Sequence, residues 1–506
     1  MSFLSLIILV LAPSLAALFI ANPWLTGDEA ETRKLSIGFS AAFFIYSLFF
    51  LFKYDFQQGG LQFVQNLRLP PEGSSWIQSM GINFSLGVDG ISLILVVLTT
   101  FLVMLACIAS KNSIVKKFKF YYSMIFILTT AVLGVFTSKD LFLFFLFWEL
   151  ELIPMYFLIS IWGSGRKEYS ATKFVLYTFT GSIFMLASIL AVYFYNHAQT
   201  GIFTFDMEAL TFHSYNYPLM YELLVFWGFF IGFAVKLPVV PLHTWLPDAH
   251  VDAPTPVSML LAGILLKMGG YGLVRMNLQM LPEAFKILAP VIVILGLINL
   301  IYAAIITFAQ DDLKKLVAYS SVSHMGIVLI GLGALNTAGV TGAVFQMFAH
   351  GVISAGLFMM VGVIYLRTKT RSIKELSGIG QAAPKIFYFS LAIVLASLGL
   401  PLFIGFAAEV LAFIGAFTSN VATPVSMQCL TVIAIFGIIL TASYLLWMLK
   451  RVFFGPVSEK VQNISDLNPG ETVVFVSLVL VIAVFGFYPS AITNVFVPTI
   501  SAIISR

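Results

Sequence analysis

The 506-residue chain is poor in charge: only 10% of its residues are Asp, Glu, Lys or Arg, whereas 60% are hydrophobic. Soluble domains carry roughly 25% charged residues, so this composition excludes soluble enzymes and disordered proteins. The mean hydropathy is +0.99, and the apolar residues fall into runs long enough to cross a bilayer, which takes about 20 residues. The composition therefore predicts an all-α polytopic membrane protein.

Cysteine is also scarce, and the two cysteines, Cys107 and Cys429, lie in separate apolar runs. The sequence contains no CxxC pair and no Cys/His cluster, so neither a disulfide framework nor a zinc or iron–sulfur site is indicated. It also lacks a Ser/His/Asp arrangement, a phosphate-binding loop and a nucleotide fingerprint. We therefore expect no metal, no bound cofactor and no covalent or redox chemistry in this chain itself.

Apolar runs bounded by charge, Gly or Pro predict about 14 transmembrane helices. The twelfth run is too long for one straight helix, which suggests a break inside it. The predicted spans lie near residues 3–22, 35–53, 90–110, 120–138, 141–162, 172–195, 219–243, 256–276, 287–309, 314–335, 340–366, 385–418, 427–449 and 472–498.

The basic residues are distributed unevenly among the connections. Connections after odd-numbered runs hold nineteen of the 27 Lys and Arg residues, and connections after even-numbered runs hold five. The positive-inside rule places the odd connections in the cytoplasm, or in the stroma of a plastid, and both termini on the other side. Because these residues sit in short connections and not on one face, the net charge of +4 does not indicate nucleic-acid binding.

Several ionisable residues lie inside the apolar runs: Glu149 and Glu151 in run 5, Lys236 in run 7, Lys267 in run 8 and Glu409 in run 12. A charged residue at a helix centre costs roughly 2.5–3.5 kcal/mol on insertion scales. One interpretation is that these residues form buried ion pairs that only lock helices together, although apolar pairs would do so at lower cost. Intramembrane charges of both signs more often mark an ion or proton path, and we favour this interpretation.

A buried lysine can carry a proton, because burial disfavours its charged form and a nearby carboxylate favours it again. If a carboxylate such as Glu149 approaches and withdraws, the amine of Lys236 gains and loses a proton. We state this pairing as a hypothesis. His324 in run 10 and His350 in run 11 could relay protons through their two ring nitrogens. Alternatively, each is a core histidine bonded to a neighbouring helix; haem ligation is disfavoured because no run holds two well-spaced histidines.

Two runs are interrupted by proline in matching places, run 7 at Pro238 and Pro241 and run 12 at Pro401. Interrupted spans in corresponding positions of two halves are typical of transporter binding sites. Because runs 7 and 12 are five apart, runs 4–8 and 9–13 are predicted to be two five-helix repeats. The expected organisation is one membrane domain over 1–506, made of residues 1–110, a first repeat over 120–276, a second over 287–449 and a last span at 472–498.

Polar residues also surround the predicted end of run 7. His243 and His250 are interpreted as part of a compact capped connection at the cytoplasmic end of run 7; a mouth for proton entry and, less well supported, a metal site are the alternatives. Lys314 and Lys315, which follow two aspartates, are expected at a solvated helix start.

The segments FWELELIPMYFLISIWG, EYSATKFVLYTFTGSIFML and GFAVKLPVVPLHTWLPDAHVDAPTPVSMLLAGILLKMGGYG closely resemble the antiporter-like subunits of complex I. The most similar type is chain 4, and the WELELIP and YSATKF segments resemble its cyanobacterial and plastid form. The resemblance is recognisable over about residues 80–455. It implies 14 helices with two inverted five-helix repeats, each containing a broken helix.

The resemblance also implies proton translocation driven by quinone reduction in sister subunits, which would hold the flavin, the iron–sulfur clusters and the quinone. Partners would be other membrane subunits, including further antiporter-like ones, in a bacterial inner membrane or a cyanobacterial or plastid thylakoid membrane. A Mrp-type Na⁺/H⁺ antiporter or a membrane-bound hydrogenase remains an alternative, and an inert membrane scaffold is another. The family's proton-translocating positions fall on Glu149, Lys236, Lys267, Glu409, His324 and His350.

Overall fold

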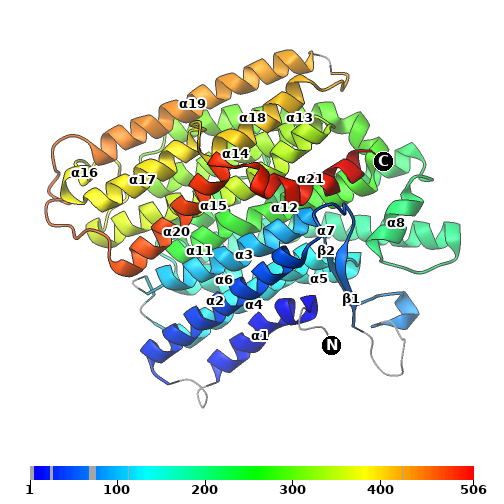
Figure 1. Cartoon of the computed structure of the whole chain (residues 1–506), viewed down its shortest axis with the longest axis horizontal. Coiled ribbons are helices and arrows are strands. Elements are labelled where there is room, and N and C mark those ends of the chain that lie inside the picture. Colours follow the sequence, from blue (N-terminus) through cyan, green and yellow to red (C-terminus); the bar gives the residue numbers. More distant parts are fainter. Residues whose placement is uncertain are drawn as a thin grey trace.

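The computed structural model describes residues 5–22, 27–67, 76–111, 113–114, 116–423 and 425–505. Long helices lie side by side along one common direction (Figure 1). Within the described residues, twelve helices are long and apolar enough to cross a membrane, which confirms a helical polytopic fold. The exact number of spans and the two repeats stay predictions. Arg68 and Arg506, which entered the charge count, lie outside the described residues.

The N-terminal part consists of three helices and a small hairpin. In the hairpin, β1 and β2 are antiparallel, with Gln62 opposite Val88. The carboxylate of Asp89 caps the helix that follows, because it accepts hydrogen bonds from the backbone N–H groups of Ile91 and Ser92. The elements are α1 (Leu6–Ala21), α2 (Glu29–Lys53), β1 (Gln62–Asn66), η1 (Gln78–Met80), β2 (Ser85–Val88) and α3 (Gly90–Ala109).

The next part contains two interrupted spans. The predicted run 141–162 divides at Glu151, since Pro154 lacks the N–H that would bond the carbonyl of Leu150. The predicted run 219–243 also divides, and its helix ends at Lys236. The elements are α4 (Phe118–Thr137), α5 (Leu141–Leu150), α6 (Leu152–Trp162), α7 (Lys167–Thr200), α8 (Met207–Ser214), α9 (Leu219–Lys236), α10 (Trp245–Asp252), α11 (Thr255–Leu260), η2 (Leu261–Leu265), α12 (Leu266–Gly272) and η3 (Leu273–Met280).

The last part confirms the break expected in run 12 and corrects run 14. Run 12 is two helices, which end and begin around Pro401. Run 14 was predicted as one span, but it divides at Tyr488 and Pro489, because proline cannot donate to the preceding turn. The elements are α13 (Pro282–Phe308), α14 (Leu313–Gly333), α15 (Thr337–Thr368), α16 (Ile379–Ala382), α17 (Pro384–Ser397), α18 (Ile404–Phe417), α19 (Met427–Phe453), α20 (Pro469–Phe487) and α21 (Ser490–Ile504).

The centre of the molecule is formed by the continuous helix over 255–280 and by α15, whose most apolar windows are entirely buried. By contrast, α2 and α20 bury little of their surface and lie at the rim. A fully buried polar residue in these central helices is shielded from lipid and from bulk water. It therefore needs a partner within the protein.

The described residues of the odd-numbered connections gather at one end of the helices, called here the lysine-rich end (33–34, 111, 113–114, 116–119, 163–167, 311–315, 367–385 and 450–468). The indole of Trp162 donates to the carbonyl of Lys116 at 2.8 Å, and Lys374 pairs with Asp311 at 2.7 Å. The hairpin and α8 lie at the opposite end, called the hairpin end, together with the described chain termini (Figure 1). The connections thus alternate between the two ends of the helices, in agreement with the order of the predicted runs.

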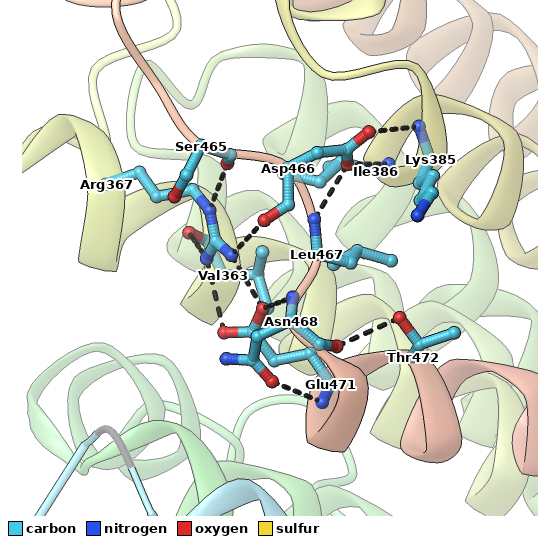
Figure 2. A network of polar contacts seen from close by, with 10 residues as sticks. All are labelled: Val363, Arg367, Lys385, Ile386, Ser465, Asp466, Leu467, Asn468, Glu471 and Thr472. Atoms are coloured by element: carbon cyan, nitrogen blue, oxygen red, sulfur yellow. Dashed lines mark hydrogen bonds and ion pairs between the residues drawn. The ribbon is translucent and has the colours of Figure 1, made fainter.

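Arg367 at the end of α15 fixes the last connection at the lysine-rich end (Figure 2). Its guanidinium donates to the carbonyls of Ser465 and Asp466 and to the carboxylate of Glu471, at 2.6, 2.9 and 2.6 Å. The Asp466 carboxylate accepts from the backbone N–H groups of Lys385 and Ile386 at the start of α17. One network therefore ties α15, α17 and α20 together.

Candidate functional site

The first interrupted helix, α9–α10, is closed by side chains from elsewhere. Asn299 on α13 donates to the carbonyl of Pro238 at 3.1 Å and accepts from the N–H of Val240 at 2.7 Å. The indole of Trp245 donates to the carbonyl of Val235 at 2.9 Å. A break in a membrane helix persists only where its freed backbone groups find partners. These bonds hold the end of α9, and with it Lys236, in one position.

Lys236 forms an ion pair with Glu151, which lies at the interruption between α5 and α6. Both side chains are fully buried. The ammonium also lies 5.5 Å from the ring centre of Trp148 and 5.3 Å from that of Phe174, so its remaining surroundings are aromatic faces that favour a cation.

The hypothesis named Glu149 as an example of a carboxylate that pairs with Lys236. The ion pair in the structure joins Lys236 to Glu151, and the half-buried Glu149 also interacts electrostatically with Lys236. Both carboxylates of run 5 therefore lie near this lysine, and the role of Glu149 in proton movement stays a prediction.

Lys267 lies on the fully buried central helix, between the two π-helical segments η2 and η3. Single π turns in helices often occur at functional sites. The Lys267 ammonium donates to the carbonyl of Ala262 and lies 2.8 Å from Nδ1 of His350 on α15. Two residues on, Gly269 lies so close to α9 that a Cβ there would be 2.7 Å from the backbone nitrogen of Leu237. The helix that carries Lys267 thus packs directly on the break that follows Lys236.

Two histidines connect Lys267 to the second interrupted helix. The ring centres of His350 and His324 are 5.8 Å apart, and Nδ1 of His324 is 3.7 Å from a carboxylate oxygen of Glu409 on α18. Gln346 and Ser397 contact the two ring nitrogens of His324 at 3.4 and 3.3 Å. His324 is therefore held in place from α15 and α17.

Glu409 lies against the interruption between α17 and α18. Gly399 there has a φ of +69°, a conformation that favours glycine, and a Cβ at this position would be 2.4 Å from Oε2 of Glu409. The glycine thus makes room for the carboxylate. Leu400 and Leu402 at the same break are 43% and 58% exposed.

The structure brings five of the six predicted site residues into a buried interior row. Lys267, His350, His324 and Glu409 follow one another through the contacts above, and Lys236 lies on the adjoining break. Glu149 lies at the edge. The sequence interpretation missed Asn299, although a lone asparagine in the apolar run 287–309 was a usable signal.

The connection after run 7 is compact, as expected, and its histidines are buried. His250 is buried and stacks on Phe358 with ring centres 4.3 Å apart. Lys314 was expected at a solvated helix start, but it is buried and donates to the carbonyl of Ala253 at 2.5 Å and more weakly to that of Val251. The expectation failed because α10 folds back into the protein, and its carbonyl end attracts the cation. In the part of the chain that is described, no three His, Cys, Asp or Glu side chains form a group that could hold a metal.

The fold and the buried row define a class of proteins, helical membrane proteins with interrupted helices and charges at mid-depth. Two family models agree with this class. Residues 138–437 match the model described as NADH:quinone oxidoreductase/Mrp antiporter, transmembrane. Residues 72–138 match the model described as NADH-ubiquinone oxidoreductase chain 4, amino terminus.

Relatives and solved structures point the same way. NAD(P)H-quinone oxidoreductase chain 4 of Acaryochloris marina is 43% identical over 97% of this chain and 90% of its own length. A chain 4 of Thermosynechococcus vestitus is 44% identical over 98% and 91%. A chain of respiratory complex I from Thermus thermophilus superposes with a TM-score of 0.87 at 26% identity over 99% of both chains. A chain of the Mrp complex from Dietzia sp. shares the fold, with a TM-score of 0.83 at 19% identity over 98% of this chain and 51% of that one.

The chain therefore belongs to the family of complex I chain 4, as the sequence motifs indicated. The similarity is wider than expected from the motifs, which were recognised over about residues 80–455, because the relatives align with nearly the whole chain. The named relatives are subunits of NAD(P)H-quinone oxidoreductases.

Proposed function

We propose that this chain is a proton-translocating membrane subunit of a complex I-type quinone oxidoreductase. The observation that carries the proposal is the buried row in which Lys267, His350, His324 and Glu409 follow one another across four helices. Charged and titratable groups are costly inside a membrane protein and mark ion or proton paths there. An inert scaffold would not need a base, two imidazoles and an acid in succession.

The row supports proton movement because each neighbour can change the charge of the next. Burial disfavours the ammonium form of an amine, and an adjacent carboxylate favours it. Separation of Lys236 from Glu151 would therefore release the lysine proton, and re-formation of the pair would draw one in. Between Lys267 and Glu409, imidazole can accept a proton on one nitrogen and donate from the other.

The wider assignment rests on the relatives. Other membrane subunits, including further antiporter-like ones, would flank this chain, and flavin, iron–sulfur clusters and the quinone would belong to sister subunits, with none bound here. The membrane would be a bacterial inner membrane or a thylakoid, and plastoquinone is a suitable acceptor in the latter. The lysine-rich end would face the cytoplasm or stroma, so both termini would lie on the other side. Residues 120–276 and 287–449 would be the two repeats.

The test measures proton pumping coupled to quinone reduction in membrane vesicles that hold the intact complex. We expect Lys236→Ala and Lys267→Ala each to abolish or severely reduce pumping while the complex still assembles. We expect the same severe loss from Glu149→Ala, because the half-buried carboxylate interacts electrostatically with Lys236. Lys374→Ala is the matched control, because this lysine is exposed at the lysine-rich end. Wild-type pumping by Lys236→Ala would favour the inert scaffold instead.

A further inference from the structure

A cavity of about 310 Å³ opens at the hairpin end. It lies between the connection from α2 to β1, the start of α3, α8, η3 and α21, and its walls are partly polar. Two ion pairs contribute to it, Lys139 with Glu208 at 2.8 Å and Arg275 with Asp89. The first pair is partly exposed, whereas the second is buried. The buried pair therefore lies at the inner part of this cavity.

The Asp89–Arg275 pair has one fixed and one movable member. One oxygen of Asp89 is held by the N–H groups at the start of α3, and the other accepts from Arg275. Arg275 also reaches Gln279, one turn along its own helix, at 3.1 Å. The guanidinium thus bonds Asp89 and Gln279 in the same conformation. If it releases Asp89, it keeps Gln279 as a partner, and the carboxylate keeps the N–H groups at the start of α3.

The wall of the cavity leads back to the buried row. Tyr271 lines the cavity, and the guanidinium of Arg275 lies 5.0 Å from the centre of its ring. Tyr271 and Arg275 lie four and eight residues beyond Lys267 on the same helix. Four residues of helix rise about 6 Å, so Tyr271 is about one turn from the lysine and Arg275 about two. The hydroxyl of Tyr271 contacts the carbonyl of Phe136 at 3.2 Å.

We infer that this cavity is an aqueous vestibule between Lys267 and the hairpin end, and that the Asp89–Arg275 ion pair is its gate. The inference rests on the proposed function. When the gate is closed, the guanidinium is an electrostatic barrier to hydronium, as a fixed arginine is in selective pores. When Arg275 releases Asp89 and keeps Gln279, water extends past Tyr271 to Lys267. The ammonium of Lys267 passes one proton to that water and becomes the neutral amine, and the proton leaves as hydronium through the vestibule.

A labelling experiment tests the vestibule in the intact complex. With Cys429 replaced by Ser, Ala502→Cys places a thiol in the cavity lining, and Ser501→Cys places one beside it on the same helix, exposed but outside the lining. Both are treated with a bulky, membrane-impermeant methanethiosulfonate from the hairpin side. We expect the label at position 502 to reduce proton pumping several-fold and the label at position 501 to leave it unchanged. Equal pumping by the two labelled variants would overturn the vestibule.

A second experiment tests the gate. In the double variant Asp89→Asn, Arg275→Met, asparagine keeps the cap of α3 and methionine keeps an apolar stem. We expect a passive proton leak through vesicles without turnover, at least several-fold above wild type, which Lys267→Met abolishes when added. Removal of the exposed pair by Lys374→Gln and Asp311→Asn is the control. A proton leak that persists after Lys267→Met is added would overturn the gate. A proton leak in the double variant no larger than that of wild type would also overturn it.

These outcomes separate the two proposals. If Lys236→Ala pumps normally, the proposed function fails and the vestibule with it. If Lys236→Ala loses pumping but the label at position 502 has no effect, only the vestibule fails. Should the double variant not assemble, Asp89→Asn alone is measured for the same leak, because asparagine keeps the cap of α3. A leak equal to wild type in that variant would overturn the gate.

Discussion

The interruptions of run 7, after α9, and of run 12, between α17 and α18, differ in how the breaks are closed and in the charge that each presents. The break after α9 is sealed by Asn299 and Trp245, and Lys236 at its edge has a fully buried carboxylate partner. The break between α17 and α18 exposes Leu400 and Leu402. Its carboxylate, Glu409, faces a histidine that is a cation only when protonated.

Proline interruptions at matching places in the sequence can therefore have different structures and serve different functions. A sealed break with an ion pair fixes a charge whose release requires the pair to separate, at a large cost in the protein interior. An open break with a single carboxylate beside imidazole allows the charge state to change with little movement. In the proposed function, the first half would therefore control the movement of protons, and the second would respond to it.

The largest effect is expected from removing the ion pair at the sealed break after α9. Glu151→Leu leaves the ammonium of Lys236 buried without its ion-pair partner and should destabilise the fold by about 3–5 kcal/mol. Adding Lys236→Met removes both charges and should restore stability to near wild type. Thermal denaturation of the purified complex measures both, and neither variant should pump. Pumping by the double variant would contradict the proposed role of the pair.

The role of the open break between α17 and α18 can be tested by substitution of Gly399. Gly399→Ala adds backbone strain of about 1–3 kcal/mol and a Cβ that displaces the Glu409 carboxylate, so pumping should fall several-fold. Gly455→Ala is the matched control: its φ is +88° and nothing lies within 4 Å of the added Cβ. If the two variants pump protons at the same rate, the contact between position 399 and Glu409 does not affect pumping.

A smaller loss should follow when the seal of the first break is removed. Asn299→Leu leaves the carbonyl of Pro238 and the N–H of Val240 buried without this partner, at about 1–3 kcal/mol for an unsatisfied group. Asn277→Leu is the comparison, because Asn277 donates to the carbonyl of Phe226, which lies within the continuous part of α9. Thermal denaturation should show the larger destabilisation for Asn299→Leu. The reverse order would mean that the break does not depend on this seal.

The smallest effect is expected at the orientation of His324. Ser397→Ala removes the hydroxyl next to Nε2 of this ring, a loss of about 0.5–1.5 kcal/mol, and should lower the pumping rate modestly. Ser390→Ala on the same helix is the control, since its buried hydroxyl has no hydrogen-bond partner among the described residues. A larger effect from the control would show that α17 packing, and not the histidine contact, is responsible.

Much of the site was predictable because a charge in an apolar run is costly wherever the helix points. Lys236, Lys267 and Glu409 stood out for this reason, and Pro238 and Pro401 marked the two breaks. Pro489 likewise marks the break in the last run, but the sequence interpretation did not predict a break there. The proton-translocating roles of these residues stay predictions.

Sequence by itself determined that this is a helical membrane protein and which ionisable residues need a partner inside it. Both follow from transfer energies that depend on composition and run length. Only the tertiary structure decided which partner each one has. Glu151 forms the ion pair with Lys236, Asn299 seals the first break, and Lys314 is buried. These outcomes depend on helix rotation and on the folding back of α10, which are set by the packing of the whole bundle.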